Sequence, residues 1–440
     1  MAANSAVLDD IFNALEPYKP LEASDPAYVD CDAVRGDGDI LDDLGNRIRK
    51  SRQTTYQLYS GHRGAGKSTE LLRLKGSLET EGCFVVYFSA IEEDVNSGDI
   101  EYTDILLACT SHLLTELKRT ANTKPLQDWL KERWEDLKDL AQTKVSLEGL
   151  DAEVAVNQFA KLTANLRTEP TLRSRIREKI NPHTPTLIKA LNEFIQDAKT
   201  KLPEGKTKLV LIVDNLDRIA PIYDERSGRS NHEEIFIDRS EQLKALDCHI
   251  IYTIPFAILF SKWANDLNQN YNDSKILPMI MVRSPDGEIH APGVATIKQI
   301  LAQRIQPFAA DLDLETEIFE SAAALERLCL MSGGHVRGLL RLAQEAVNRT
   351  ETLPISAKAV QRAITEERDS YRRAVEEHQW DLLAAVSRDK QIQHDMAHRS
   401  LLFNLCLLEY SYLDEHGEKL TWYDVHPLIE NIPQFKERRS

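Results

Sequence analysis

The segment from Gly61 to Ser68 has the residue types and the spacing of a phosphate-binding loop. It reads GHRGAGKS and satisfies the pattern G-x-x-x-x-G-K-[ST]. Glycines in such a loop let backbone amides turn inward around a phosphate. With average residue usage, the pattern arises by chance in only about one or two chains in a hundred of this length. We therefore expect phosphate contacts from Gly61, His62, Arg63, Gly64, Ala65, Gly66, Lys67, Ser68 and Thr69.

The flanking residues place this loop between a strand and a helix. A short β-type run begins at Tyr56, and leucines with helical spacing follow the loop at Leu71, Leu72, Leu74 and Leu78. A helix that begins near Lys67 points its positive end at a bound anion. We expect Lys67 to reach the outer phosphates and the Ser68 hydroxyl to bind Mg²⁺.

A second chemical feature is the carboxylate that ends the apolar run LVLIVDNLDRI, residues 209–219. A strand buried on both faces has such an unbroken apolar sequence, and open α/β sheets bind ligands at the carboxyl ends of their strands. In nucleotide sites with a phosphate loop, an Asp at the end of a second strand binds Mg²⁺, and Asp214 fits this role. The alternative is that Asp214 only caps the following turn. Because the loop is present, we favour a metal site at Ser68 and Asp214.

Three further apolar runs predict strands, at 83–91, 249–255 and 276–282. Strands separated by helical stretches indicate a parallel sheet with helices on both faces. Helical periodicity between 120 and 200 predicts an inserted, mostly helical subdomain and a place for partner contact. Within it, the partly alternating residues 145–156 are a candidate hairpin.

The composition argues against a general polyanion binder, because 54 Lys and Arg face 70 Asp and Glu, a net charge of −16. Three basic clusters, around residues 47–52, 173–177 and 436–439, are more often solvated helix faces than nucleic-acid contacts. The six scattered cysteines indicate buried thiols in a reducing compartment. Without a secretory leader or an apolar run long enough to span a bilayer, we expect a cytoplasmic protein that contacts no membrane.

With these motifs the chain resembles, over roughly residues 25–365, the AAA+ ATPases and their relatives, the signal-transducing STAND ATPases. The resemblance implies an α/β fold, a parallel-sheet P-loop NTPase (AAA+-like) core that binds ATP and Mg²⁺. The expected parts are an N-terminal helix or arm (1–24), the NTPase domain (25–290) with its helical insertion (120–200), a helical lid (291–368), and a small winged-helix-like C-terminal domain (369–440).

The resemblance also implies roles for residues outside the loop. The segment ahead of the loop is similar to the one that helps cover the adenine, with Val29 and Arg35 as the nearest matches. Thr253 stands where the family has its first sensor, which contacts the γ-phosphate or the attacking water. Gly334 and Arg337 are similar to the second sensor, whose Arg reaches the phosphates from the lid.

Two departures from the family pattern bear on catalysis. AAA+ enzymes usually place a Glu directly after the metal-binding Asp, as the base that polarises water, and here that residue is Asn215. A carboxamide orients water but cannot accept its proton near neutral pH, and the nearest carboxylate is Asp217. Residues 261–275, where AAA+ rings carry an arginine finger, contain no Arg. We therefore expect slow or partner-dependent hydrolysis.

Three functions remain open at this point. The favoured one is an ATP/ADP switch that controls a protein partner, such as an effector or an assembly subunit, or that drives homo-oligomerisation. Relatives with this layout act in bacterial antiphage defence. The second is a DNA-binding AAA+ ATPase of the replication-initiator or transposition-regulator type, which the acidic balance counts against. The third is a scaffold in which nucleotide only stabilises the fold.

Overall fold

The computed structural model describes residues 2–36, 38–142, 151–224 and 226–439. Its central sheet contains, in spatial order, β2 (Cys83–Ser89), β3 (Lys208–Asp214), β4 (His249–Thr253), β1 (Tyr56–Gly61) and β5 (Asp273–Leu277). Every pair of neighbouring strands is parallel, which confirms the predicted sheet. The carboxyl ends of β1, β2, β3 and β4 therefore meet at one edge, where the polar residues of the two motifs lie.

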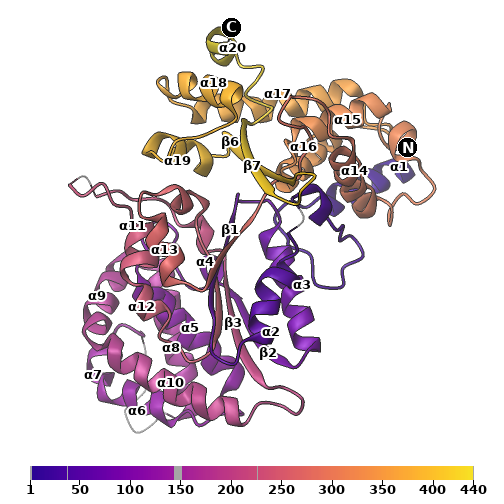
Figure 1. Ribbon diagram of the computed structural model, residues 1–440. Helices are drawn as coiled ribbons and strands as arrows, with labels where there is room; N and C mark the ends of the chain where they lie inside the picture. Colours follow the sequence, from indigo (N-terminus) through magenta and orange to yellow (C-terminus); the bar gives the residue numbers. More distant parts are fainter. Residues whose placement is uncertain (1, 37, 143–150, 225, 440) are drawn as a thin grey trace.

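Alternate residues of β3 enter two separate apolar cores, which explains its unbroken apolar sequence. Leu209, Leu211 and Val213 lie in the core shared with α5 (Tyr102–Leu117) and the insertion. Val210 and Ile212 lie in the core shared with α3 (Lys67–Thr80). Helices therefore cover both faces of the sheet, as predicted (Figure 1).

The strand predicted at 276–282 is wrong for most of its length, because β5 ends at Leu277. The residues after it are buried but bond to other parts of the chain. The Met279 N–H donates to the Glu409 carbonyl, and the Met281 N–H donates to the Val34 carbonyl, both at 3.0 Å. The apolar run thus reflects burial under the C-terminal and N-terminal segments and not a place in the sheet.

The insertion is helical, as predicted. Asp151 caps α8 (Ala152–Thr168) by accepting the N–H of Val154, so the candidate hairpin at 145–156 is wrong in its second half. The apolar residues of α8 recur at helical spacing, and the partly alternating residues at its start belong to one face of that helix. Residues 145–150 lie outside the described residues. The helices of the insertion are α6 (Lys124–Glu132), α7 (Trp134–Leu137), α8 (Ala152–Thr168), α9 (Pro170–Ile180) and α10 (Thr184–Thr200).

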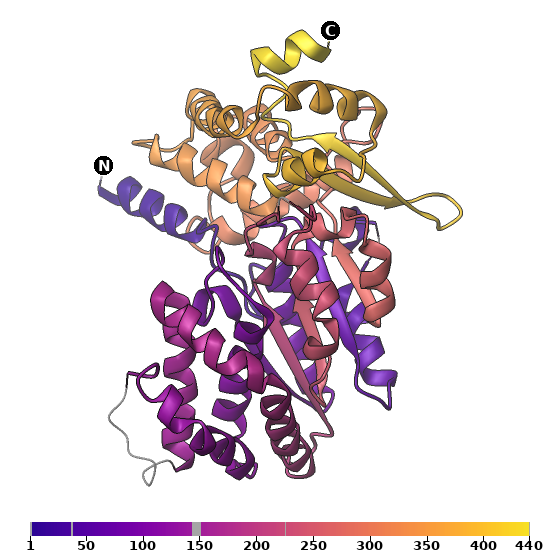
Figure 2. The same ribbon diagram turned by 90° about the vertical axis from the view of Figure 1, so that its left-hand side faces the viewer.

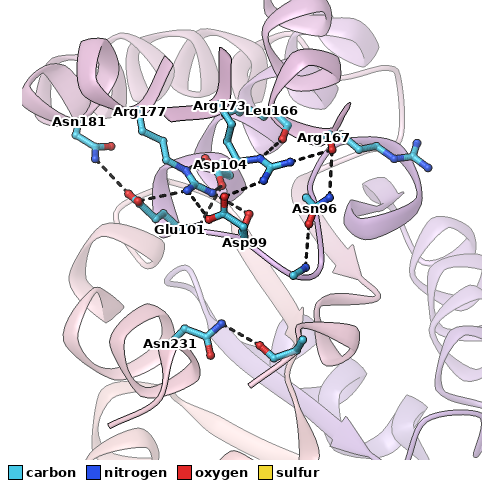
Figure 3. Close-up of polar contacts among 12 residues, drawn as sticks. Asn96, Asp99, Glu101, Asp104, Leu166, Arg167, Arg173, Arg177, Asn181 and Asn231 are labelled. Atoms are coloured by element: carbon cyan, nitrogen blue, oxygen red, sulfur yellow. Dashed lines mark hydrogen bonds and ion pairs between the residues drawn. The ribbon is translucent and has the colours of Figure 1, made fainter. Parts of the chain in front are cut away.

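Two arginines of α9 hold the insertion to acidic residues of the loop after α4 (Ala90–Glu93) and of the first turn of α5, and we call this group the α9 clamp (Figure 3). Arg177 bonds to Asp104 at 2.5 Å and to Asp99 at 2.7 Å, and Arg173 bonds to Asp99 at 2.8 Å. Both arginines are buried, whereas Arg175 between them is exposed. The expectation of a solvated or nucleic-acid-binding basic face is therefore wrong for Arg173 and Arg177, which share one helix face at i, i+4 spacing.

The predicted lid and C-terminal module lie together at one end of the molecule, with the insertion at the opposite end (Figures 1 and 2). In the C-terminal module, β6 (Leu407–Leu413) and β7 (Lys419–Val425) pair as antiparallel strands and form a hairpin around Gly417. Helix α1 (Ala2–Ala14) packs against α14 (Ala291–Ile305) and α16 (Val336–Asn348). The elements of this end are α14 (Ala291–Ile305), α15 (Ala322–Met331), α16 (Val336–Asn348), α17 (Ala357–Ala374), α18 (Gln379–Asp389), α19 (Met396–Phe403), β6 (Leu407–Leu413), β7 (Lys419–Val425) and α20 (Pro433–Arg439).

The remaining short helices close loops around the sheet. All six cysteines are buried free thiols, as expected. Within the described residues, no helix combines the length and the apolar character needed to cross a membrane. The short helices are α2 (Asn46–Lys50), α11 (Asn231–Glu233), α12 (Ser240–Leu243) and α13 (Ala264–Asn270).

Candidate nucleotide-binding site

The predicted phosphate loop connects the end of β1 to the first turn of α3. Gly61, Gly64 and Gly66 have φ angles of 142°, 83° and 115°, a region that glycine adopts without strain. A Cβ on Gly64 would lie 2.5 Å from His335 Nε2 and 2.7 Å from the Cβ of Arg337. Glycine at position 64 therefore serves a close approach by the lid, in addition to the turn of the loop.

Lys67 is held at the mouth of the loop. Its Nζ donates to the carbonyl oxygens of Gly61 and His62 at 2.8 and 2.9 Å, and it lies 2.9 Å from Asp217 Oδ2. Both members of this ion pair are buried. The two carbonyl oxygens thus fix the position of the ammonium group, and the Asp217 carboxylate neutralises its charge in the free protein.

Asp214 and Ser68, the two predicted metal ligands, are joined by a side-chain hydrogen bond, and their binding of Mg²⁺ stays a prediction. Asp214 is 1% exposed, and its Oδ2 accepts the Tyr87 hydroxyl at 2.8 Å. Burial and the charge of Asp217 raise the pKa of Asp214, whereas hydrogen bonds from Ser68 and Tyr87 oppose that rise. A hydroxyl and one carboxylate fit Mg²⁺ that takes its other ligands from phosphates and water. Among the described residues, no group of three or more His, Cys, Asp or Glu could hold a metal by itself.

Asn215, which stands where the family has a Glu, is fixed by its backbone and its amide. Its φ is 64°, in the left-handed region that Asn tolerates better than most residues. Its Nδ2 donates to Ser89 Oγ at 2.7 Å. The amide therefore joins the ends of β3 and β2, where Ser89 and Asp214 lie opposite each other in the pairing.

Three residues assigned through the resemblance lie outside the cavity lining. Thr253 is fully buried, and its Oγ1 accepts the N–H of Leu216 at 3.0 Å, so it supports the turn after β3. Arg35 donates to the Ala65 carbonyl at 2.7 Å, and Val29 belongs to an apolar core. A direct contact of Thr253 with phosphate or water stays a prediction.

A cavity of about 370 Å³ opens in front of the loop, within the size range of ligand pockets. Its walls carry seven cationic residues against four carboxylates, an excess of positive charge in an acidic chain. The seven are Lys19, Arg63, Lys67, Lys75, Arg218, Arg304 and Arg337; the four are Glu22, Glu92, Glu93 and Asp217. The cavity is therefore suited to a polyanion of the size of a nucleoside triphosphate.

Arg337, the predicted second sensor, lies in this cavity at the start of α16. Its backbone N–H donates to the Gly64 carbonyl at 3.1 Å, and its guanidinium lies 5.4 Å from the centre of the Tyr18 ring. Burial and the positive charges of Arg218 and Arg63 lower the pKa of Arg337. Gly334 allows the close approach behind it, because a Cβ there would lie 1.7 Å from the Ile280 carbonyl oxygen.

The back of the loop contacts the lid and the C-terminal module. His335 Nε2 donates to the Arg63 carbonyl at 2.7 Å, and burial lowers the pKa of His335 to about 3, so the ring is neutral. His62 Nε2 accepts the N–H of Glu409 in β6 at 3.0 Å, and burial lowers the pKa of His62. His62 thus faces protein, whereas Arg63, Gly64, Gly66, Lys67, Ser68 and Thr69 line the cavity.

Two parts of the lining were not predicted from the sequence. The first is the N-terminal arm from Pro17 to Glu22, which the Leu21 N–H anchors to Thr69 Oγ1 at 3.1 Å. The second is the pair Glu92 and Glu93 at the end of α4. The arm carries no motif. The acidic pair follows a predicted strand and offered the same signal that singled out Asp214.

The comparisons with known proteins identify similar structures only. No protein-family model matches the chain, and no curated protein matches it in sequence. The Walker-type ATPase of Pyrococcus abyssi is 12% identical and covers 92% of this chain and 98% of its own, with a TM-score of 0.39. The ORC2 protein of Aeropyrum pernix, in ADPNP–ADP complexes, is 12% identical and covers 97% and 95%, with a TM-score of 0.39. The ORC1 protein of the same organism, in complex with DNA, is 12% identical and covers 97% of this chain and 96% of its own, with a TM-score of 0.38.

The assignment of the fold rests on the parallel sheet and the phosphate loop of the chain itself. β1, the loop and α3 form the strand–loop–helix unit of a P-loop NTPase, and β3 brings Asp214 to Ser68. The chain has an α/β P-loop NTPase core.

Proposed function

We propose that this protein is an ATP-binding switch ATPase of the AAA+/STAND type, with slow or partner-stimulated hydrolysis. The observation that carries the proposal is the cavity in front of the loop, where cationic residues exceed carboxylates. Arg218 from the sheet edge and Arg337 from the lid both line it. A bound triphosphate would therefore contact the core and the lid at once, and Mg²⁺ at Ser68 and Asp214 would neutralise its charge. Asn215 in place of a Glu supports slow turnover.

The contacts behind the loop support a switch over a simple binder. Arg63 and Gly64 accept hydrogen bonds from the lid, and His62 accepts one from the C-terminal hairpin. A shift of the loop on phosphate binding must alter these contacts, because each uses a backbone group of the loop or of β6. The lid and the C-terminal module would then report ATP or ADP to a protein partner.

Limited proteolysis tests the switch. Mg²⁺–ATP and Mg²⁺–ADP are expected to give different cleavage patterns in the arm at 15–24 and the connections of the lid, since the two nucleotides differ in contacts to Arg337 and Arg218. Identical patterns, with equal thermal stabilisation by both nucleotides, would favour the scaffold function. No binding of either nucleotide in a calorimetric titration would contradict the proposal.

The identity of the partner requires experiments on cells. A pull-down of the wild-type chain, with ATP and with ADP, is expected to recover an effector or assembly subunit in one nucleotide state. The role in bacterial antiphage defence is carried by the family resemblance alone. Phage plating on cells with the wild-type chain and with Lys67→Ala tests it, and equal plaque counts would contradict it.

The DNA-binding alternative receives less support from the described residues. Arg173 and Arg177 are internal, and Arg438 in the C-terminal cluster pairs with Asp381 at 3.4 Å. Helix α19, in the C-terminal module, buries His398 and Arg399, and Arg399 bonds to Glu233 of the core at 2.7 Å. A mobility-shift titration with and without ATP tests this function, with salt-sensitive binding at low micromolar protein as the supporting result.

A further inference from the structure

The carboxylates of the nucleotide cavity differ in their partners. Asp217 bonds to Lys67 at 2.9 Å, and Glu92 bonds to Arg218 at 2.7 Å. Glu22 belongs to the N-terminal arm and not to the sheet edge. Among the described residues, Glu93 is the carboxylate at the sheet edge that lines the cavity without a Lys or Arg in ion-pair distance. Its capacity to accept a proton is therefore not already committed to a fixed cation.

The position of Glu93 follows from the pairing of β2 with β3. Ser89 at the end of β2 lies opposite Asp214 at the end of β3, and α4 begins with the next residue. Helix α4 packs against β3 and against the turn at 216–218 that carries Asp217. Glu93 thus reaches the cavity from the helix that follows β2, the strand next to the one that ends in Asp214, the predicted metal ligand.

Two contacts hold this carboxylate in place while leaving it open to the cavity. Glu93 Oε1 accepts the N–H of Ser89 at 3.0 Å, and Oε2 lies 3.8 Å from His112 Nε2. His112 is itself held, since it bonds to Asp94 at 2.8 Å and stacks on Phe88. Half of the Glu93 side chain remains exposed. A general base needs both properties, a fixed position and access to the water it deprotonates.

The α9 clamp holds the chain just after Glu93. Asp99 is bonded by Arg173 and Arg177 (Figure 3). The backbone carbonyl of Ser97 accepts the N–H of Ala220 at 2.8 Å. The segment that carries Glu93 is therefore tied to the insertion on one side and to the loop after β3 on the other. A positioned carboxylate loses little freedom when the substrate binds.

We propose that Glu93 is the general base of the ATP hydrolysis proposed above, in the role that Asn215 cannot perform. This inference rests on the proposed function. A water molecule between Glu93 and the γ-phosphorus transfers its proton to the carboxylate as its oxygen forms the bond to phosphorus. The bond from phosphorus to the bridging oxygen breaks, and ADP leaves with that electron pair. Glu93 then releases the proton to solvent, so the products are ADP, phosphate and one proton.

The test compares four variants of the full-length chain in Mg²⁺–ATP: Glu93→Gln, Glu92→Gln, Asp217→Asn and the distant control Glu116→Gln. Glu116 is an exposed residue of α5, the helix that carries His112. Glu93→Gln keeps a side-chain oxygen for the Ser89 N–H and removes only the proton acceptor. Two quantities are measured, the single-turnover rate and, by equilibrium titration, the ATP affinity. The nucleotide retained after one hour is also identified by chromatography.

Glu93→Gln is expected to lower the single-turnover rate at least about 100-fold, the usual size of a general-base contribution. Its ATP affinity should stay within about threefold of wild type, and the retained nucleotide should be ATP where wild type retains ADP. Glu92→Gln should lower the rate less than about tenfold, and Glu116→Gln should match wild type. These limits follow from the same range of general-base effects.

Three results would overturn the inference while leaving ATP binding intact. They are a Glu93→Gln rate within about fivefold of wild type, an equal or larger loss in Glu92→Gln or Asp217→Asn without loss of affinity, and a wild-type chain that binds ATP without turning it over. Failure of the proposed function looks different, because the wild-type chain would then bind no ATP in the same titration.

Discussion

The nucleotide cavity and the α9 clamp both bring arginines to carboxylates, but only in the clamp do the carboxylates outnumber the cationic residues. In the clamp, Arg177 meets Asp99, Glu101 and Asp104 within 3.5 Å. In the cavity, seven cationic residues meet four carboxylates. Arginines paired with carboxylates of the chain therefore hold the fold together, whereas cationic residues in excess over carboxylates are suited to bind an added anion.

The pKa shifts of two arginines express this difference. In the clamp, burial disfavours the charge of Arg177, but the hydrogen bonds and charges of its acidic neighbours outweigh burial and raise its pKa. In the cavity, burial and neighbouring positive charges lower the pKa of Arg337. A guanidinium whose charge is disfavoured in the free protein gains most from an added anion. The comparison thus predicts that the clamp governs stability and the cavity governs binding.

Breaking the clamp should give the largest effect on stability. Arg177→Met leaves the Asp104 carboxylate, 1% exposed, without its cation, so the free energy of unfolding should fall by about 3–5 kcal/mol. Chemical denaturation measures this loss. The exposed neighbour Arg175→Met should change stability by no more than about 0.5 kcal/mol.

A second variant separates the clamp from the binding site. Arg177→Met combined with Asp104→Leu removes both charges and should recover part of the lost stability. ATP affinity, measured where the variant is folded, should stay within about threefold of wild type, or within roughly 0.7 kcal/mol. A large loss of affinity without a loss of stability would show that the clamp belongs to the binding site.

The loss of the loop lysine should give the largest effect on binding. Lys67→Ala removes the ammonium group at the mouth of the loop, and ATP affinity should fall at least about 100-fold, or roughly 2.8 kcal/mol. Equilibrium titration measures it, with Lys75→Ala at the rim as a milder comparison. Lys67→Ala with Asp217→Asn controls for the carboxylate left without a partner. Retained affinity within a few-fold would contradict the site.

The sequence could predict the features whose cause is local. The loop pattern from Gly61 to Ser68 sets its own conformation through glycines, and the apolar run before Asp214 predicts a buried strand with a carboxylate at its end. Because parallel strands end at one edge, the two motifs were expected to meet, and Ser68 does bond to Asp214. Both expectations needed only nearby residues and the rules of sheet packing.

The features that depend on distant partners could not be predicted in this way. Arg173 and Arg177 looked like a surface cluster because their acidic partners lie about seventy residues earlier in the chain. The arm at 17–22 carries no pattern that indicates a contact with Thr69. The sequence shows that Asn215 replaces the Glu expected from the AAA+ resemblance, but only the structure shows that its backbone is left-handed. Long-range contacts decided each of these cases.

Arg337→Ala, in the lid, should lower ATP affinity without lowering the stability of the free protein. ATP affinity should fall about tenfold, or roughly 1.4 kcal/mol, because a cation that meets the phosphates is lost. The stability of the free protein should hardly change, since burial already disfavours the charge of Arg337. Arg341→Ala is the matched control on the same helix. Arg341 forms an ion pair with Glu367 at 2.9 Å and does not line the cavity. A loss of stability as large as that of the Arg177 variant would contradict the distinction.

Asn215→Glu should give the smallest effect, because a carboxylate at position 215 is not expected to act as the general base. By sequence alone this change predicts faster hydrolysis, since it restores the family's carboxylate. The structure reverses that expectation, because the φ of 64° disfavours Glu and the bond from Asn215 to Ser89 Oγ would be lost. We expect a single-turnover rate no more than about twofold above wild type, far below a general-base effect. A tenfold rise would show that the backbone yields, and would return the role of the base to the end of β3.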